Sequence, residues 1–321
     1  MYARRFILMA LLATSMTLGF SQATFAQSKI KVVATTGMIA DAARVLGGDL
    51  VDVRALMGPG VDPHAYRQTR SDIVAMTRAD LVLWHGLYLE AQMEGFFHDL
   101  GRNRTVIAVA EGISKNQLHA HDTYADKFDP HVWMDPTIWS DVVTQVQLAL
   151  TEVYPEGADL FAANAAGYRT ELAALATYAT ETLKAVPKDA RVLLTAHDAF
   201  GYFGAAYGFE VVGIQGISTE SEAGLNRISA MVDLLVTRNI GAVFVESSVS
   251  DRNMRALIEG AGARGHEVIV GGELYSDAMG PDGTYEGSYL GMIDHNVTVI
   301  ADALGAAGPA RGRLGKLSAG F

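Results

Sequence analysis

Three histidines and one aspartate stand at wide intervals along this chain. They are His64, His131, His197 and Asp277. Three imidazoles and one carboxylate make a complete ligand shell for a borderline divalent metal such as Zn²⁺. Their intervals of 67, 66 and 80 residues are far wider than those of a zinc finger. A site built from these four residues would therefore form only after the whole chain has folded.

Two of these histidines share a local sequence. The tripeptide Asp62-Pro63-His64 recurs as Asp129-Pro130-His131. Proline fixes its φ angle and removes a backbone donor, which limits how far the following imidazole can swing. A preformed ligand loses less entropy on binding. We also expect that the aspartate of each tripeptide could hold a ring nitrogen of its histidine.

Each of these residues also has an ordinary explanation. A single histidine in a loop is more often solvated than a ligand, and an aspartate in a Gly-rich stretch, such as Asp277, commonly serves as a turn or cap residue. The combination of the repeated tripeptide with three positions that follow predicted strands favours the metal site. Glu246 also follows a strand, where it could line the site or cap the strand end.

The other histidines lack this context. His119 and His121 lie in a polar loop, where they are either solvated or a weak auxiliary segment for metal capture. His85 follows a strand too, but in a turn with no repeated context, and we expect structural or solvated roles for His98, His266 and His295.

Short apolar runs separated by helix-length segments must position these residues. In the first part of the chain the predicted strands are residues 30–36, 51–57, 81–84 and 105–109. Most are apolar on both faces, as buried parallel strands are, whereas 51–57 alternates and is predicted nearer a sheet edge. Helices are predicted at 38–46 and 71–77, the latter capped by Thr69 or Ser71. In such sheets, ligands bind beyond the carboxyl ends of the strands.

A long helical segment interrupts this alternation. Residues 156–185 are rich in Ala, Leu and Glu and lie between Pro155 and Pro187. We interpret them as a helix that connects two lobes; the alternative is two helices broken at Gly167. Strands are then predicted at 191–195, 210–214, 242–245 and 267–270, with a helix at 254–262, and residues 304–321 are expected to fray.

The first 26 residues are typical of a signal peptide, with Arg4 and Arg5 before an apolar run and small residues up to Ala26. The expected domains are therefore 1–26 signal peptide, 27–155 N-terminal α/β lobe, 156–186 linking helix and 187–321 C-terminal α/β lobe. The sequence contains no cysteine, which argues against thiolate metal sites and a lipid anchor. We expect a protein that diffuses in a bacterial periplasm.

Charge and motifs exclude several functions. Removal of the signal leaves 23 basic against 36 acidic residues, a net charge of −13 that disfavours nucleic acid. The chain also has no dinucleotide-binding Gly-x-Gly-x-x-Gly after its first strand, no Gly-x-Ser-x-Gly elbow and no His-Glu-x-x-His helix.

The surroundings of the four residues resemble the solute-binding proteins of bacterial zinc, manganese and iron ABC transporters, known as metal-binding family 9. The segments that carry the resemblance are 58–64, 129–136, 195–203 and 272–277, and the likeness runs from Lys29 to Leu304. The resemblance implies two α/β lobes joined by one long rigid helix. It also implies a metal held in the cleft between the lobes by the four residues, and delivery of that metal to a membrane permease by a monomer.

The resemblance leaves the metal open between zinc, which is favoured, manganese close behind, and iron. Many manganese-preferring members have Glu where this chain has His197, and zinc-preferring members often have a His-rich loop that this chain lacks. Three imidazoles favour zinc, while a bidentate Asp277 could supply the further oxygen that Mn²⁺ prefers. Because binding needs neutral imidazoles, we expect weaker metal retention below about pH 6.

Two other functions compete with transport. A zinc-dependent hydrolase could use three histidines and an open position to activate water. A metal-storing or adhesion protein would instead carry its functional surface away from the cleft. We favour a non-enzymatic binding protein, because Asp277 fills the fourth position and no general base is placed beside it.

Overall fold

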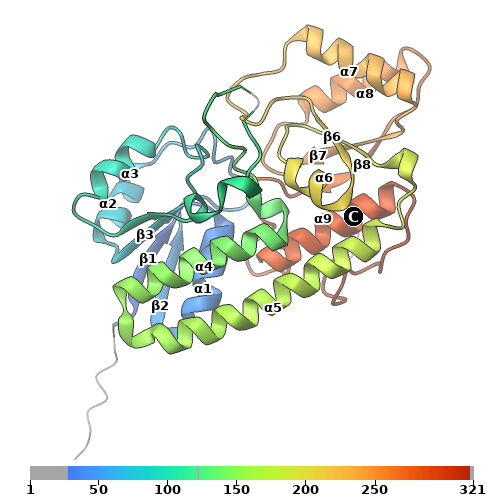
Figure 1. Cartoon of the computed structure of the whole chain (residues 1–321). Coiled ribbons are helices and arrows are strands. Elements are labelled where there is room, and N and C mark those ends of the chain that lie inside the picture. Colours follow the sequence, from blue (N-terminus) through green and yellow to red (C-terminus); the bar gives the residue numbers. More distant parts are fainter. Residues whose placement is uncertain (1–27, 122, 319–321) are drawn as a thin grey trace, which may run out of the picture.

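The computed structural model describes residues 28–121 and 123–318, in which two α/β halves are joined by one long helix (Figure 1). The first half, before that helix, contains a parallel sheet in the order β2-β1-β3-β4. Its strands are β1 (Ile30–Ala34), β2 (Val51–Ala55), β3 (Leu81–Trp84) and β4 (Val106–Ala108). The alternating segment at 51–57 is therefore an edge strand, as predicted.

Helices cover both faces of this sheet. They are α1 (Gly37–Gly47), α2 (Arg70–Arg78), α3 (Glu94–Leu100) and α4 (Pro136–Val153). Neighbouring residues of β1 point to opposite faces, so that Val32 joins the core with α1 and α4, whereas Val33 joins the smaller core with α2 and α3. Thr69 is the N-cap of α2, where it forms a capping box with Asp72.

The long helix is α5 (Ala158–Leu183), and it is continuous through Gly167. The predicted alternative of two helices broken at that glycine is wrong. At about 1.5 Å per residue its 26 residues span about 39 Å. Its buried residues recur every three or four positions: Phe161, Ala165, Tyr168, Leu172, Leu175, Ala179 and Leu183. This apolar stripe packs against α1 and α4 from the first half and against α9 from the second, along the bottom of Figure 1.

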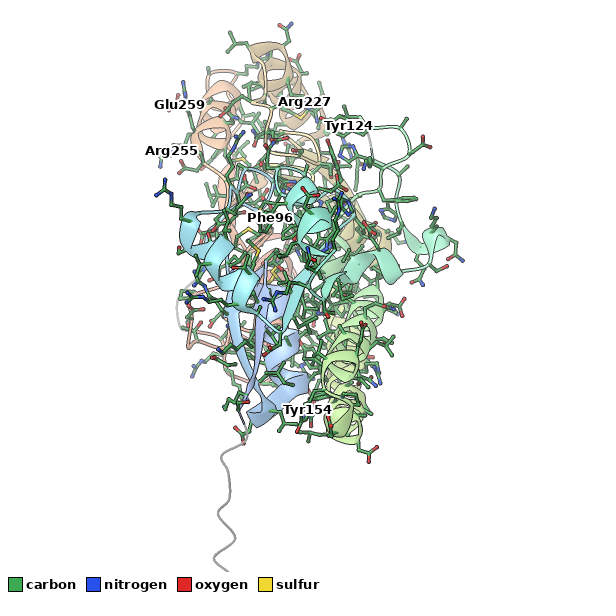
Figure 2. The ribbon with its side chains drawn as sticks, turned by 90° about the vertical axis from the view of Figure 1, so that its left-hand side faces the viewer. Phe96, Tyr124, Tyr154, Arg227, Arg255 and Glu259 are labelled. Carbon is green, nitrogen blue, oxygen red and sulfur yellow. The ribbon has the colours of Figure 1, made fainter. Side chains whose placement is uncertain are left out.

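The second half, after α5, contains two parallel strand pairs, with β5 beside β7. The strands are β5 (Val192–Thr195), β6 (Glu210–Gly213), β7 (Ala242–Glu246) and β8 (Ile269–Leu274). The helices are α6 (Gly201–Tyr207), α7 (Leu225–Arg238), α8 (Arg252–Gly262) and α9 (Tyr289–Ala303). Helices α7 and α8 pack together at the end of the molecule marked by Arg227, Arg255 and Glu259 in Figure 2, far from Tyr154 beside the start of α5.

One hydrophobic core runs through both halves. Ala34 of β1, Leu172 of α5, Phe203 of α6 and Ile300 of α9 all belong to it. The boundaries at 27–155, 156–186 and 187–321 stay predictions, but this shared core favours small tilts over a wide hinge movement.

The segment after α9 does not fray as expected. Leu317 is fully buried, and the backbone N–H of Arg313 donates to both carboxylate oxygens of Asp294 at 2.9 Å. Residues 304–318 are thereby fastened to α9. The predicted signal peptide at 1–26 lies outside the described residues, and among those that are described no helix is long and apolar enough to cross a membrane.

Candidate metal centre

The four sequence-predicted ligands converge on one point. His64 follows β2, His131 precedes the 3-10 turn Val132–Met134, and His197 follows β5, while Asp277 lies three residues after the end of β8. One ligand atom from each lies within 4.8 Å of every other, and all four residues are buried. We refer to these four residues as the His/Asp cluster.

The spacing of the ligand atoms suits a small cation. The Nε2 atoms of His64 and His131 are 3.3 Å apart. Asp277 Oδ1 lies 3.4 Å from Nε2 of His131, and Asp277 Oδ2 lies 3.1 Å from Nε2 of His197. A tetrahedral shell with bonds of ~2.1 Å separates its ligand atoms by about 3.4 Å. The His/Asp cluster therefore has nearly the spacing of a tetrahedral site.

Several buried polar atoms of the cluster lack a hydrogen-bond partner within the described chain, which favours a bound cation. Among the described residues, Nε2 of His197 and both carboxylate oxygens of Asp277 have no hydrogen-bond partner. An unsatisfied buried polar atom costs about 1–3 kcal/mol, and a lone buried charge costs more. A divalent ion between these atoms would satisfy all of them, so the residues present fit a metal.

Carboxylates orient two of the three imidazoles. Asp129 Oδ1 accepts from the backbone N–H of His131 at 3.0 Å and lies 2.7 Å from its Nδ1. Glu246 Oε1 accepts from the backbone N–H of His197, and Glu246 Oε2 lies 2.5 Å from Nδ1 of that histidine. With Nδ1–H donating to the carboxylate, Nε2 is left free for a metal. The sequence left Glu246 open between lining the site and capping a strand, and its contact is with the site.

His64 is held differently. Asp62 Oδ1 accepts from the backbone N–H of His64 at 2.8 Å, and within the described chain Asp62 makes no hydrogen bond to the His64 ring. The other oxygen of Asp62 accepts from the Thr219 hydroxyl of the second half at 2.6 Å. The expected aspartate contact with a ring nitrogen is therefore correct for His131 only.

The segment that carries Asp277 is fixed from two sides. The indole N–H of Trp133 donates to the carbonyl of Ser276 at 2.7 Å. The Asn296 side chain accepts from the N–H of Tyr275 and donates to its carbonyl. Sequence reasoning missed Trp133 and Asn296, since both act through backbone atoms more than 20 residues away.

The surroundings lower the pKa of one imidazole of the cluster and raise the pKa of the other two. Burial lowers the pKa of His64 to about 3, although Asp277 opposes that shift. Burial disfavours the charged form of His131 too, but Asp129 and Asp277 outweigh it and raise the pKa of His131 to about 9. In the same way Asp277 and Glu246 raise the pKa of His197 well above its ordinary value. An incoming metal must therefore displace protons even at neutral pH, so competition by protons extends above the pH 6 expected from an unperturbed imidazole.

Three other histidines, His85, His119 and His121, have defined contacts. The ring of His85 is buried, its Nε2 donates to the carbonyl of Pro130 at 2.7 Å, and it packs edge-on to Trp133. His119 stacks on Tyr202 with ring centroids 4.2 Å apart. Nδ1 of His121 accepts from two backbone N–H groups, and its side chain lines the same narrow pocket as His64. Whether His121 assists metal capture stays a prediction.

Comparison with known proteins covers nearly the whole described chain. Residues 32–303 match the family described as ZnuA, zinc-uptake complex component A, periplasmic. The chain is 46% identical over 279 residues to the manganese-binding lipoprotein MntA of Bacillus subtilis, which is 87% of this chain and 91% of that protein. It is 42% identical over 306 residues to the zinc-binding protein TroA of Treponema pallidum, which is 94% of this chain and 99% of that protein.

The fold agrees with these sequence matches. The solved structure of the periplasmic zinc-binding protein TroA from Treponema pallidum superposes with a TM-score of 0.84 at 44% identity. The superposition covers 86% of this chain and 99% of that one. The relatives are named for different metals, so similarity alone does not choose between zinc and manganese.

Proposed function

Because the chain belongs to the family of periplasmic zinc-uptake components, it is a metal-binding solute-binding protein of an ABC importer, and we propose that the His/Asp cluster holds the transported ion. The proposed ligands are His64, His131, His197 and Asp277. Family membership also places the chain among non-enzymatic transport components, which disfavours the hydrolase alternative.

The observation that carries the ligand assignment is the convergence of four buried residues from four separate loops, two of which, His197 and Asp277, have buried polar atoms without a hydrogen-bond partner in the described chain. Replacement of His197 by Ala tests it. We expect the variant to lose most of its high-affinity binding of Zn²⁺ in calorimetry, while His98→Ala, which changes an exposed histidine, keeps it. Unchanged affinity in His197→Ala would refute the assignment.

We propose zinc as the favoured cargo and manganese as the closest alternative. Three imidazole nitrogens suit Zn²⁺. The two oxygens of Asp277 face different imidazoles, at 3.4 Å from His131 and 3.1 Å from His197, so a bidentate carboxylate could also complete the larger shell of Mn²⁺. Zn²⁺ binds more tightly than Mn²⁺ or Fe²⁺ to almost any such site. Elemental analysis of protein purified from its own cells, without added metal, therefore identifies the cargo better than affinity does.

The finer aspects of location and partners are also proposals. The predicted signal peptide and the absence of cysteine from the sequence support diffusion in the periplasm, although the similar MntA is named a lipoprotein, and we propose that the protein acts as a monomer. The partner that family membership implies is the permease of the importer. Deletion of the gene should lower uptake of the cargo metal, and unchanged uptake would favour metal storage or adhesion instead.

A further inference from the structure

The segment between β6 and α7 lies beside His64 of the His/Asp cluster. We call residues 215–222 the strap. Ile217, Ser218 and Glu220 of the strap line the same pocket as His64, and the free volume of this pocket is about 10 Å³. That is room for about one water molecule, so this pocket as it stands does not admit a hydrated metal ion.

The start of the strap is fixed to the second half. Gln215 donates its backbone N–H to Ala196 and its side-chain amide to the carbonyl of Ser221, which closes the strap into a compact loop. The guanidinium of Arg227, labelled near the top of Figure 2, donates to the carbonyls of Gly213 and Ile214. The base of the strap is thus firmly seated.

The middle of the strap makes two side-chain hydrogen bonds to the first half. The hydroxyl of Thr219 donates to Asp62 at 2.6 Å, and the amide of Gln92, just before α3, donates to the carboxylate of Glu220. Because the other oxygen of Asp62 accepts from the backbone N–H of His64, the first bond reaches a proposed ligand through a single side chain. The strap therefore connects the two halves beside the proposed ion site.

From this arrangement we propose that the strap is a latch whose bonds from Thr219 and Glu220 set the rate at which the bound metal leaves. Thr219 is in addition a positioning residue, because it holds the carboxylate that orients His64. The inference depends on the proposed function, since a latch has a role only if the His/Asp cluster binds the cargo.

One other route to the cluster competes with the strap. A pocket of about 190 Å³ reaches Asp277 from the side of Arg54 and Gly58. An ion that left by this route would pass Asp277 and would not require the strap to move. The latch variants below distinguish the two routes, because they alter only the strap side.

The first test replaces Thr219 by Val, which keeps the shape of the side chain and removes its hydroxyl. Zn²⁺-loaded protein is mixed with an excess of a coloured chelator, and the rate of metal transfer is followed by stopped flow. We expect dissociation to accelerate about 3- to 10-fold, the effect of one hydrogen bond, with a smaller change in the association rate. Thr237→Val is the matched control, because its hydroxyl bonds only within α7.

The second test uses charge. Gln92→Glu places a carboxylate opposite Glu220 and should accelerate dissociation more than Thr219→Val does. Adding Glu220→Gln restores an amide facing a carboxylate and should return the rate toward that of the unaltered protein. Glu222→Gln makes the same charge change two residues along the strap and should leave the dissociation rate unchanged. A merely destabilised loop would not be rescued by the exchanged pair.

Unchanged dissociation in both Thr219→Val and Gln92→Glu would overturn the latch and indicate the route beside Asp277. This outcome is distinct from a failure of the proposed function, because His197→Ala would still abolish binding. Melting curves of the metal-free variants show whether each is folded. If a single variant is not folded, the dissociation rate of the exchanged pair Gln92→Glu/Glu220→Gln tests the latch instead.

Discussion

The two Asp-Pro-His tripeptides are identical in sequence but differ in how the fold holds them. The second, at His131, is fixed within its surroundings: Asp129 holds both the backbone N–H and the ring, and the hydroxyl of Tyr202 donates to the carbonyl of Asp129 at 2.8 Å. The first, at His64, is held through its backbone only, by Asp62, which is itself bonded to Thr219 of the strap. Both aspartates are thus bonded to the second half, through Tyr202 and Thr219, but only Asp129 also holds the ring of its histidine.

Removal of either histidine is expected to have the largest effect. His131→Ala and His64→Ala each delete a proposed ligand, so each should lower the affinity for Zn²⁺ by more than the roughly 10- to 100-fold that loss of an outer partner costs. Titration against a chelator of known affinity measures the loss. Retention of full affinity by His64→Ala alone would mean that the two tripeptides differ in function as well as in support.

Competition between protons and the metal should affect the two tripeptides differently, and we expect this effect to be the second largest. The pKa of His131 is raised to about 9, whereas that of His64 is lowered to about 3. Below pH 9 the imidazole of His131 is protonated and must lose its proton when the metal binds, whereas the imidazole of His64 is already neutral. Affinity should therefore rise with pH from 6 to 9, by about tenfold per pH unit for each proton released. Calorimetry in buffers of different ionisation enthalpy counts these protons, and a count of zero at pH 7 would contradict the assignment.

The four proposed ligands could be predicted because three of them follow strands, and parallel strands bring their carboxyl ends to one edge. The repeated tripeptide identified the other. Their supports could not be predicted in the same way. Glu246 meets His197 across 49 residues, and Thr219 meets Asp62 across 157. The first contact depends on how β5 lies beside β7 within the second half and the second on how the two halves pack, and a single sequence carries no local pattern for either.

The long helix and the C-terminal segment also differ in how far the local sequence predicts their structure. A run of good helix formers predicted α5 correctly, since helix propensity is local. Fraying of the C-terminal segment was expected from its composition, but Leu317 is buried and Arg313 is bonded to Asp294. Tertiary contacts outweighed the local composition there.

The aspartates of the tripeptides offer a matched pair of variants with intermediate effects. Asp129→Ala removes the partner of both the ring and the backbone of His131, so we expect about a 10- to 100-fold loss of affinity for Zn²⁺. Asp62→Ala removes only the backbone bond and the link to the strap, so we expect about a 3- to 10-fold effect, mainly in the dissociation rate. Equal losses in the two variants, measured by chelator competition, would show that the tripeptides are held alike.

A change in α5 should affect neither tripeptide, and its expected effect is the smallest. Gly167 is exposed in the middle of this helix, and a Cβ added there meets no atom within 4 Å. Gly167→Ala should therefore raise the free energy of unfolding by about 0.5–1 kcal/mol, because alanine loses less backbone entropy in a helix. Urea unfolding of the metal-free protein measures this gain, and Zn²⁺ dissociation should stay as it was. If Zn²⁺ dissociation changed in this variant, the flexibility of α5 would also control metal release. The difference between the tripeptides would then depend on a helix outside the metal site.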